Sequence, residues 1–171
     1  DPGPGEARVR QTAVGLNFID TYHRTGLYPM TFPAILGVEA AGVVDEIGDG
    51  VTEVAVGDPV VYTEMPPGAY TQERIMPADR LVKLPDSTDD QTAAAAMLKG
   101  LTAQFLLRRT YTVQPGDKIL VHAAAGGVGL ILCQWGKHLG ATVIGTVGSE
   151  EKAELARAHG CDHAIVYTRE N

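Results

Sequence analysis

The sequence has little cysteine and few aromatic residues. Its 171 residues include two cysteines, Cys133 and Cys161, and only 6% of the residues are aromatic. Two isolated cysteines form neither a disulfide framework nor a metal cluster, so we expect each to be a small, buried side chain. This cysteine usage is typical of proteins in a reducing compartment and predicts a cytoplasmic location.

Long apolar runs and an excess of positive charge are also absent from the sequence. The apolar runs are too short to span a bilayer, and nothing at the start resembles a signal peptide. The formal net charge of −7 offers no basic surface for nucleic acid or anionic lipid. We therefore expect an ordinary soluble globular protein with neither a membrane nor a nucleic-acid partner.

Two patterns of secondary structure follow one another along the chain. Over residues 8–85, short β-like runs alternate with turns such as Val56–Pro59, which predicts a small, strongly bent antiparallel barrel or sandwich. From Asp89, an alanine-rich helix is followed by alternating strands and helices, including a helix over 150–159 and a strand near 163–167. The predicted fold class is therefore α/β, with a β-rich domain before a parallel sheet.

The most informative stretch is the glycine-rich turn within residues 118–129. Ala124-x-Gly126-x-x-Gly129 is a variant of G-x-G-x-x-G in which alanine replaces the first glycine. An apolar strand precedes it, a helical pattern starts at Gly129, and a second apolar strand follows at 142–147. Such a turn presents backbone N–H groups to a dinucleotide pyrophosphate. The alternative is a structural turn that binds no ligand.

The end of the second strand indicates which dinucleotide is bound. NAD sites usually carry an acidic residue about 20 residues after the glycines, whereas this strand runs into Gly148 and Ser149, with Lys152 one turn later. A hydroxyl, free helix N–H groups and an ammonium group favour a 2′-phosphate, so NADPH is expected as the cofactor rather than NADH. The alternative is that Ser149 only caps a helix and Lys152 is a solvated surface side chain, partly offset by Glu150 and Glu151.

Five segments, taken together, resemble one known family. They are 14–22 (VGLNFIDTY), 24–29 (RTGLYP), 37–42 (GVEAAG), 99–102 (KGLT) and 122–129 (HAAAGGVG). The sequence resembles the quinone oxidoreductase branch of the medium-chain dehydrogenase/reductase superfamily, the zeta-crystallin-like NADPH:quinone reductases. The resemblance implies a β-rich GroES-like catalytic domain over residues 1–98, without its first strands. A truncated, doubly wound Rossmann sheet that binds NADPH would follow over residues 99–171.

The resemblance also assigns an activity and site residues by position. It implies a homodimer that transfers electrons from NADPH to a small-molecule quinone. Catalytic roles are expected for Asn17, Asp20, Tyr22 and Tyr28, with Asn17 and Tyr22 as hydrogen-bond donors to a quinone oxygen. The expected cofactor-binding residues are Phe18, Thr102, Phe105, Ala124, Gly126, Gly127, Val128, Gly129, Gly148, Ser149, Lys152 and Tyr167. Each aromatic ring could instead serve packing alone, and Asp20 could merely cap a short helix over residues 20–25.

No metal site is expected from the sequence. In the zinc alcohol dehydrogenases of the same superfamily, a cysteine and a histidine bind the catalytic zinc, and Asn17 and Val38 occupy the corresponding positions here. Because valine cannot bind zinc, the sequence predicts a zinc-independent oxidoreductase. A quinone needs positioning against the nicotinamide more than activation by a metal. Two alternatives stay open: an enoyl ketone or enoyl thioester reductase, and a non-catalytic NADPH-binding protein.

Relative to the family pattern, the sequence is expected to be part of a longer enzyme. The resemblance implies further strands of the catalytic domain and three further Rossmann strands. In a doubly wound sheet the fourth strand pairs with the first. We therefore expect residues 118–122 to form an apolar edge of the sheet.

Overall fold

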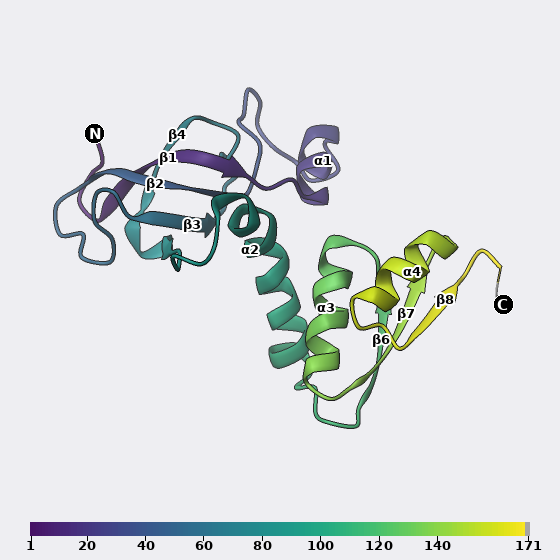
Figure 1. Ribbon diagram of the computed structural model, residues 1–171. Helices are drawn as coiled ribbons and strands as arrows, with labels where there is room; N and C mark the ends of the chain where they lie inside the picture. The colour runs from purple at the N-terminus through teal and green to yellow at the C-terminus, as the bar shows by residue number, and fades with distance from the viewer. Residues whose placement is uncertain (170–171) are drawn as a thin grey trace. The chain divides into compact units, whose positions relative to one another are not determined.

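The computed structural model describes residues 1–169 and divides into two compact units. The first unit runs from Asp1 to Leu98, and the second begins at Lys99. Figure 1 shows that the first is mainly antiparallel β structure and that the second alternates strands and helices. The predicted fold class is thereby confirmed. Among the described residues, no helix combines the length and the apolarity that crossing a bilayer requires.

The first unit is built on a five-stranded antiparallel sheet in the order β4-β1-β2-β3-β5. Its elements are β1 (Glu6–Val14), α1 (Phe18–Thr25), β2 (Glu39–Ile47), β3 (Pro59–Thr63), β4 (Glu73–Pro77), the 3₁₀ turn Ala78–Arg80 and β5 (Val82–Lys83). Side chains alternate between the two faces of the sheet. Ala7 and Val9 are fully buried, whereas Arg8 between them pairs with Asp45 at 2.8 Å.

The second unit contains a three-stranded parallel sheet in the order β6-β7-β8. Helix α2 (Asp90–Phe105), which contains the boundary between the units, leads into a π-helical turn, Leu106–Thr110. The elements that follow are β6 (Lys118–His122), α3 (Gly127–His138), β7 (Thr142–Val147), α4 (Glu150–Ala158) and β8 (His163–Val166). Within the described part of the chain, β6 pairs only with β7, which confirms the expected edge.

Cys133 and Cys161 are both free and buried, as predicted. They belong to the core of the second unit, together with Val121, Val143 and Val147. Burial raises the pKa of the Cys133 thiol to about 12, and the neighbouring Cys161 adds to this rise. The two thiols therefore act as small core side chains and not as nucleophiles.

Gly129 and Gly100 offer a matched pair of alanine substitutions. A Cβ at Gly129 would lie 2.2 Å from the Ala123 carbonyl oxygen, whereas a Cβ at Gly100 meets no atom within 4 Å. We expect Gly129→Ala to lower the free energy of unfolding by about 1–3 kcal/mol, because backbone must shift. Gly100→Ala should raise it by about 0.5–1 kcal/mol through better helix propensity. Thermal unfolding followed by circular dichroism measures both, and equal effects would contradict the close packing at Gly129.

The raised pKa of Cys133 predicts slow alkylation of the folded protein. Because the thiolate is the reactive form, a pKa of about 12 leaves only about one thiol in ten thousand ionised at pH 8. We expect iodoacetamide to modify Cys133 much more slowly in the folded protein than in protein unfolded by guanidinium. The rate for the folded protein should still rise with pH above 9. Mass spectrometry of timed samples measures the rates. Similar rates in folded and unfolded protein would disprove the burial of this thiol.

Candidate functional site

The turn between β6 and α3 presents backbone N–H groups at the surface. Gly126 is the extended N-cap of α3, and as a glycine it supplies no side-chain acceptor to the first turn. Gly126 and Gly127 are exposed, and Val128 is partly buried. Helix α3 begins two residues before the expected Gly129, because Gly126 already caps it. Free N–H groups and the positive end of the helix dipole together make such a helix start suitable for binding a phosphate group.

Close backbone contacts hold this turn in one conformation. Ala123 has a φ of 51°, a value that residues with a Cβ rarely adopt. Its carbonyl oxygen accepts from the Gly126 N–H at 2.8 Å, and the Ala124 N–H donates to the Thr146 carbonyl oxygen at 3.1 Å. Ala124 is fully buried beneath the turn, so its contact with a cofactor stays a prediction. The turn is fixed to β7 before any ligand binds.

Helix α2 contributes side chains to the second unit near the same turn. A Cβ on Gly127 would lie 2.9 Å from Cδ of Lys99, so the lysine chain packs over this glycine. Thr102 and Phe105 lie three residues apart on one face of α2. Thr102 is partly buried and Phe105 is 58% exposed. Their cofactor contacts stay predictions, and Lys99 joins the candidate residues although it was noticed in the sequence only as part of a motif.

Ser149 and Lys152 lie at the start of α4, directly after β7. Ser149 is the N-cap of α4, as predicted, and its Oγ accepts from the Lys152 backbone N–H at 3.3 Å. The hydroxyl keeps its own hydrogen for a further acceptor. The Lys152 side chain is exposed. Oε1 of Glu150 lies 3.4 Å from Nη1 of Arg157. This ion pair offsets part of the negative charge beside Lys152.

Tyr167 lies against the same strand end. A Cβ on Gly148 would come within 2.9 Å of the Tyr167 hydroxyl oxygen, so the glycine leaves room for the ring. The Tyr167 backbone N–H donates to the Val147 carbonyl oxygen at 3.2 Å, and the residue is 62% exposed. Gly148, Ser149 and Tyr167 thus meet at the carboxyl end of β7.

In the first unit, α1 places Asn17 and Asp20 together at its N-terminus. Asn17 is the N-cap, with extended backbone, and the Asp20 carboxylate accepts from the Asn17 backbone N–H at 2.8 Å. The two residues form a capping box. Asp20 therefore takes part in capping, as the alternative had it, but the expected helix bounds of 20–25 were wrong, because the helix begins at Phe18 and Asp20 is its third residue. Asp20 is only 3% exposed.

Tyr70 holds Asp20 from a distant part of the chain. Its hydroxyl donates to Oδ2 of Asp20 at 2.9 Å. Burial raises the pKa of Tyr70 to about 12, and the hydrogen bond to Asp20 acts in the same direction. The ring lies over Gly37, where a Cβ would be 2.4 Å from a ring carbon. Tyr70 therefore stays a donor at neutral pH. Nothing in the sequence indicated Tyr70 as a site residue, because tyrosines are common after turns.

Glu39 is a buried carboxylate at the start of β2. It is 0% exposed, and both of its oxygens accept hydrogen bonds. Oε1 accepts from the Asn17 side-chain amide and Oε2 from the Leu98 backbone N–H, each at 2.7 Å. Glu39 was not among the predicted site residues. The sequence feature that could have identified it is an acidic residue inside the apolar run 38–41. Acidic side chains are rarely buried without partners, so this position indicates a buried, hydrogen-bonded carboxylate.

Three aromatic rings gather on α1 and the loop that follows it. The Tyr22 ring is edge-on to that of Tyr28, with centroids 5.4 Å apart, and lies 6.4 Å from that of Phe18. Phe18 is 79% exposed and Tyr28 is 47% exposed. Exposed rings of this kind offer a surface to a planar ligand. The first unit thus brings Asn17, Phe18, Asp20, Tyr22 and Tyr28 close to one another.

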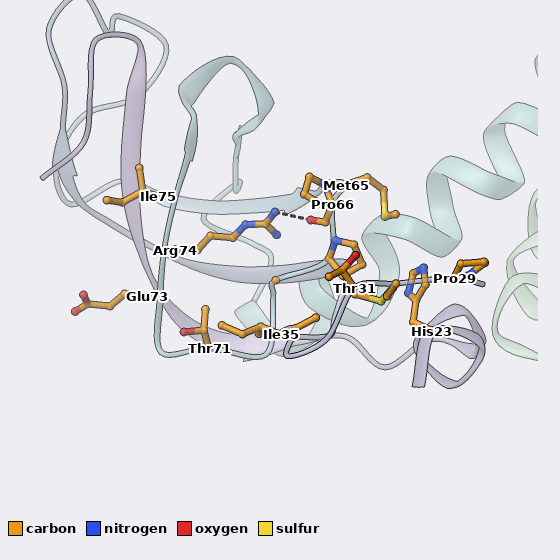
Figure 2. A pocket seen from close by; sticks show the side chains of 14 residues that line it. His23, Pro29, Thr31, Ile35, Met65, Pro66, Thr71, Glu73, Arg74 and Ile75 are labelled. Carbon is orange, nitrogen blue, oxygen red and sulfur yellow. Dashed lines mark hydrogen bonds between the residues drawn. The ribbon is translucent and has the colours of Figure 1, made fainter. Parts of the chain in front are cut away.

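A separate cavity of about 700 Å³ lies in the first unit. Figure 2 shows that its walls come from His23, the loop after α1, the turn at 65–68, Thr71 and the first residues of β4. Nη2 of Arg74 donates to the Pro66 carbonyl oxygen at 2.8 Å and so braces one wall. His23 is 4% exposed, and its Nδ1 has no partner among the described residues. None of the predicted catalytic residues lines this cavity.

Within residues 1–169, no three histidine, cysteine, aspartate or glutamate side chains are grouped closely enough to hold a metal ion. Val38, at the position that resembles a zinc ligand in related dehydrogenases, is 3% exposed and offers only hydrocarbon.

Comparisons with known proteins agree with this geometry. A family model described as an alcohol dehydrogenase GroES-like domain matches residues 3–86, and one described as a zinc-binding dehydrogenase matches residues 127–171. The chain is 56% identical over its whole length to a quinone oxidoreductase of Pseudomonas aeruginosa. It is 53% identical, over 99% of its length, to a 2-haloacrylate reductase of a Burkholderia species. Each match covers 53% of the relative, so the chain spans about half the length of these relatives.

A solved structure gives the same result. The quinone oxidoreductase of Escherichia coli, crystallised with NADPH, matches with a TM-score of 0.97 and 49% identity. The match covers 100% of this chain and 53% of that one. The antiparallel unit is therefore GroES-like, and the parallel unit is Rossmann-like. Over the half of their length that it spans, the chain is similar to quinone oxidoreductases of the medium-chain dehydrogenase/reductase superfamily.

Proposed function

We propose that the protein is a zinc-independent oxidoreductase that transfers electrons from NADPH to quinones. The observation that carries the proposal is the exposed, glycine-capped start of α3, together with Ser149 and Lys152 at the start of α4. Several relatives are named quinone oxidoreductases, and one solved relative was crystallised with NADPH. These names favour quinone reduction over enoyl reduction or a non-catalytic role.

NADPH fits the residues of the second unit. The first N–H groups of α3 would bind the pyrophosphate, because they face solvent and lack a side-chain cap. The Ser149 hydroxyl and the Lys152 ammonium group would bind the 2′-phosphate, and no carboxylate ends β7 to repel it. Bound NADPH would supply the electrons for the reduction.

The first unit would bind the quinone substrate. The Asn17 amide and the Tyr22 hydroxyl are hydrogen-bond donors that would stabilise negative charge on a quinone oxygen. The exposed rings of Phe18 and Tyr28 would pack against a planar substrate. No metal is required, because a quinone already accepts electrons readily.

The proposal extends to the cellular setting. The free, buried thiols of Cys133 and Cys161 lie next to one another and suit a reducing compartment such as the cytoplasm. A homodimer is proposed on the resemblance to the family, whose members commonly assemble in this way.

Lys152→Ala tests the assignment of the 2′-phosphate site. We expect the affinity for NADPH to fall about tenfold, because a charge-assisted hydrogen bond is lost, while the weaker affinity for NADH stays the same. Quenching of protein fluorescence by each nucleotide measures the dissociation constants.

Lys118→Ala is the matched control for this substitution. It removes the same charge from the opposite end of the parallel sheet, where β6 begins, and should leave both affinities unchanged. A wild-type preference for NADH, or an equal loss in both variants, would refute the assignment of Ser149 and Lys152.

A panel of acceptors tests the reaction itself. We expect NADPH to be oxidised by 1,4-benzoquinone and 9,10-phenanthrenequinone, with little reaction toward crotonyl thioesters, because the exposed rings of Phe18 and Tyr28 suit a planar aromatic acceptor. Prior dialysis against a zinc chelator should leave the rates unchanged. Absorbance of NADPH measures turnover. Faster reduction of the thioester, or loss of activity with the chelator, would contradict the proposal.

A further inference from the structure

The side-chain amide of Asn17 has two ends of opposite hydrogen-bonding character. Its nitrogen carries two N–H donors, whereas its oxygen only accepts. Because a quinone oxygen is also an acceptor, Asn17 can assist reduction only when its NH₂ group is directed toward the substrate. Asn17 is partly exposed, so a ligand can reach it. The orientation of this amide therefore decides whether the residue can act.

The structure gives the amide a partner that selects one orientation. Nδ2 of Asn17 donates to Oε1 of Glu39 at 2.7 Å. A carboxylate oxygen accepts hydrogen bonds and does not donate them. The reversed amide would place its oxygen against the carboxylate, which is repulsive. One N–H of the amide thus points at Glu39, and the planar geometry of the NH₂ group directs the second N–H elsewhere.

Glu39 is itself held by groups other than Asn17. Its Oε2 accepts from the Leu98 backbone N–H at 2.7 Å, and the residue is 0% exposed. Gly15 lies directly against the carboxyl group, since a Cβ there would be 2.2 Å from Oε1 and 2.3 Å from Cγ of Glu39. The backbone of α2 and the residue after β1 therefore enclose the carboxylate. Its position does not depend on the amide that it orients.

We infer that Glu39 is a positioning residue, which holds the Asn17 amide so that its second N–H is available to a substrate oxygen. The inference rests on the proposed quinone reductase function. Glu39 acts through Asn17 and does not touch the substrate. The capping box with Asp20 fixes the backbone of Asn17, and Glu39 fixes the direction of its side chain.

Glu39→Gln tests the inference with almost no change of shape. The new amide can still accept from the Leu98 N–H and then presents its own NH₂ group to Asn17, which reverses the preferred orientation of the Asn17 amide. We expect kcat/KM for the quinone to fall roughly ten- to a hundredfold, while KM for NADPH changes by less than about twofold. Glu46→Gln, a partly exposed position on the same strand, is the control and should keep full activity.

A double variant separates positioning from a general structural effect. Adding Glu39→Gln to Asn17→Ala should cause no further loss of quinone turnover, because both changes remove the same donor. A further loss in the double variant would overturn the inference. An unchanged quinone rate in Glu39→Gln alone would overturn it as well.

Nuclear magnetic resonance of the Asn17 side chain tests the orientation without turnover. The amide resonance is identified by its disappearance in Asn17→Ala. We expect one of its two protons to be shifted strongly downfield by the carboxylate, and to return toward the ordinary amide range in Glu39→Gln. Ordinary shifts for both protons in the wild type would overturn the inference. If the shift is present and no quinone is reduced, the proposed function fails while the positioning of the amide stands.

Discussion

A buried carboxylate joins three elements of the first unit. Glu39, on β2, accepts from the N-cap of α1 and from a backbone N–H of α2. A charge removed from water is tolerated only where hydrogen bonds replace its hydration. The two contacts of 2.7 Å meet that requirement, and they fix Asn17 in doing so. Because Asn17 caps α1, the aromatic residues of that helix also depend on this contact for their position.

Close approach of backbone recurs at each candidate site. Gly15 leaves space for the Glu39 carboxylate, Gly37 for the Tyr70 ring and Gly148 for the Tyr167 hydroxyl. At the start of α3, Gly129 lets the helix lie against the Ala123 carbonyl. In every case a Cβ would occupy the place of a neighbouring group. In each unit, the absence of a side chain thus lets neighbouring groups approach the backbone closely.

Local patterns in the sequence were sufficient to predict the strands and helices of the parallel unit. The alternation of apolar runs and turns predicted β7 and β8, and Ser149 was correctly expected to cap α4, because these features depend on neighbouring residues.

The start of α1 was missed, since Asn17 and Asp20 are both good capping residues and only the backbone distinguishes them. Glu39, Tyr70 and Lys99 were missed because their contacts join distant residues; the bond from Leu98 to Glu39 spans 59 positions. The spacing of apolar residues along the sequence carries no information about a contact between residues so far apart.

The orientation of the Asn17 amide is the most direct consequence of this arrangement, and neutron diffraction from deuterated crystals observes it without reference to activity. The account predicts two deuterons on the amide atom that faces Oε1 of Glu39, one directed at that oxygen and the other away from it. An amide oxygen facing Glu39, with both deuterons on the opposite side, would contradict the central claim.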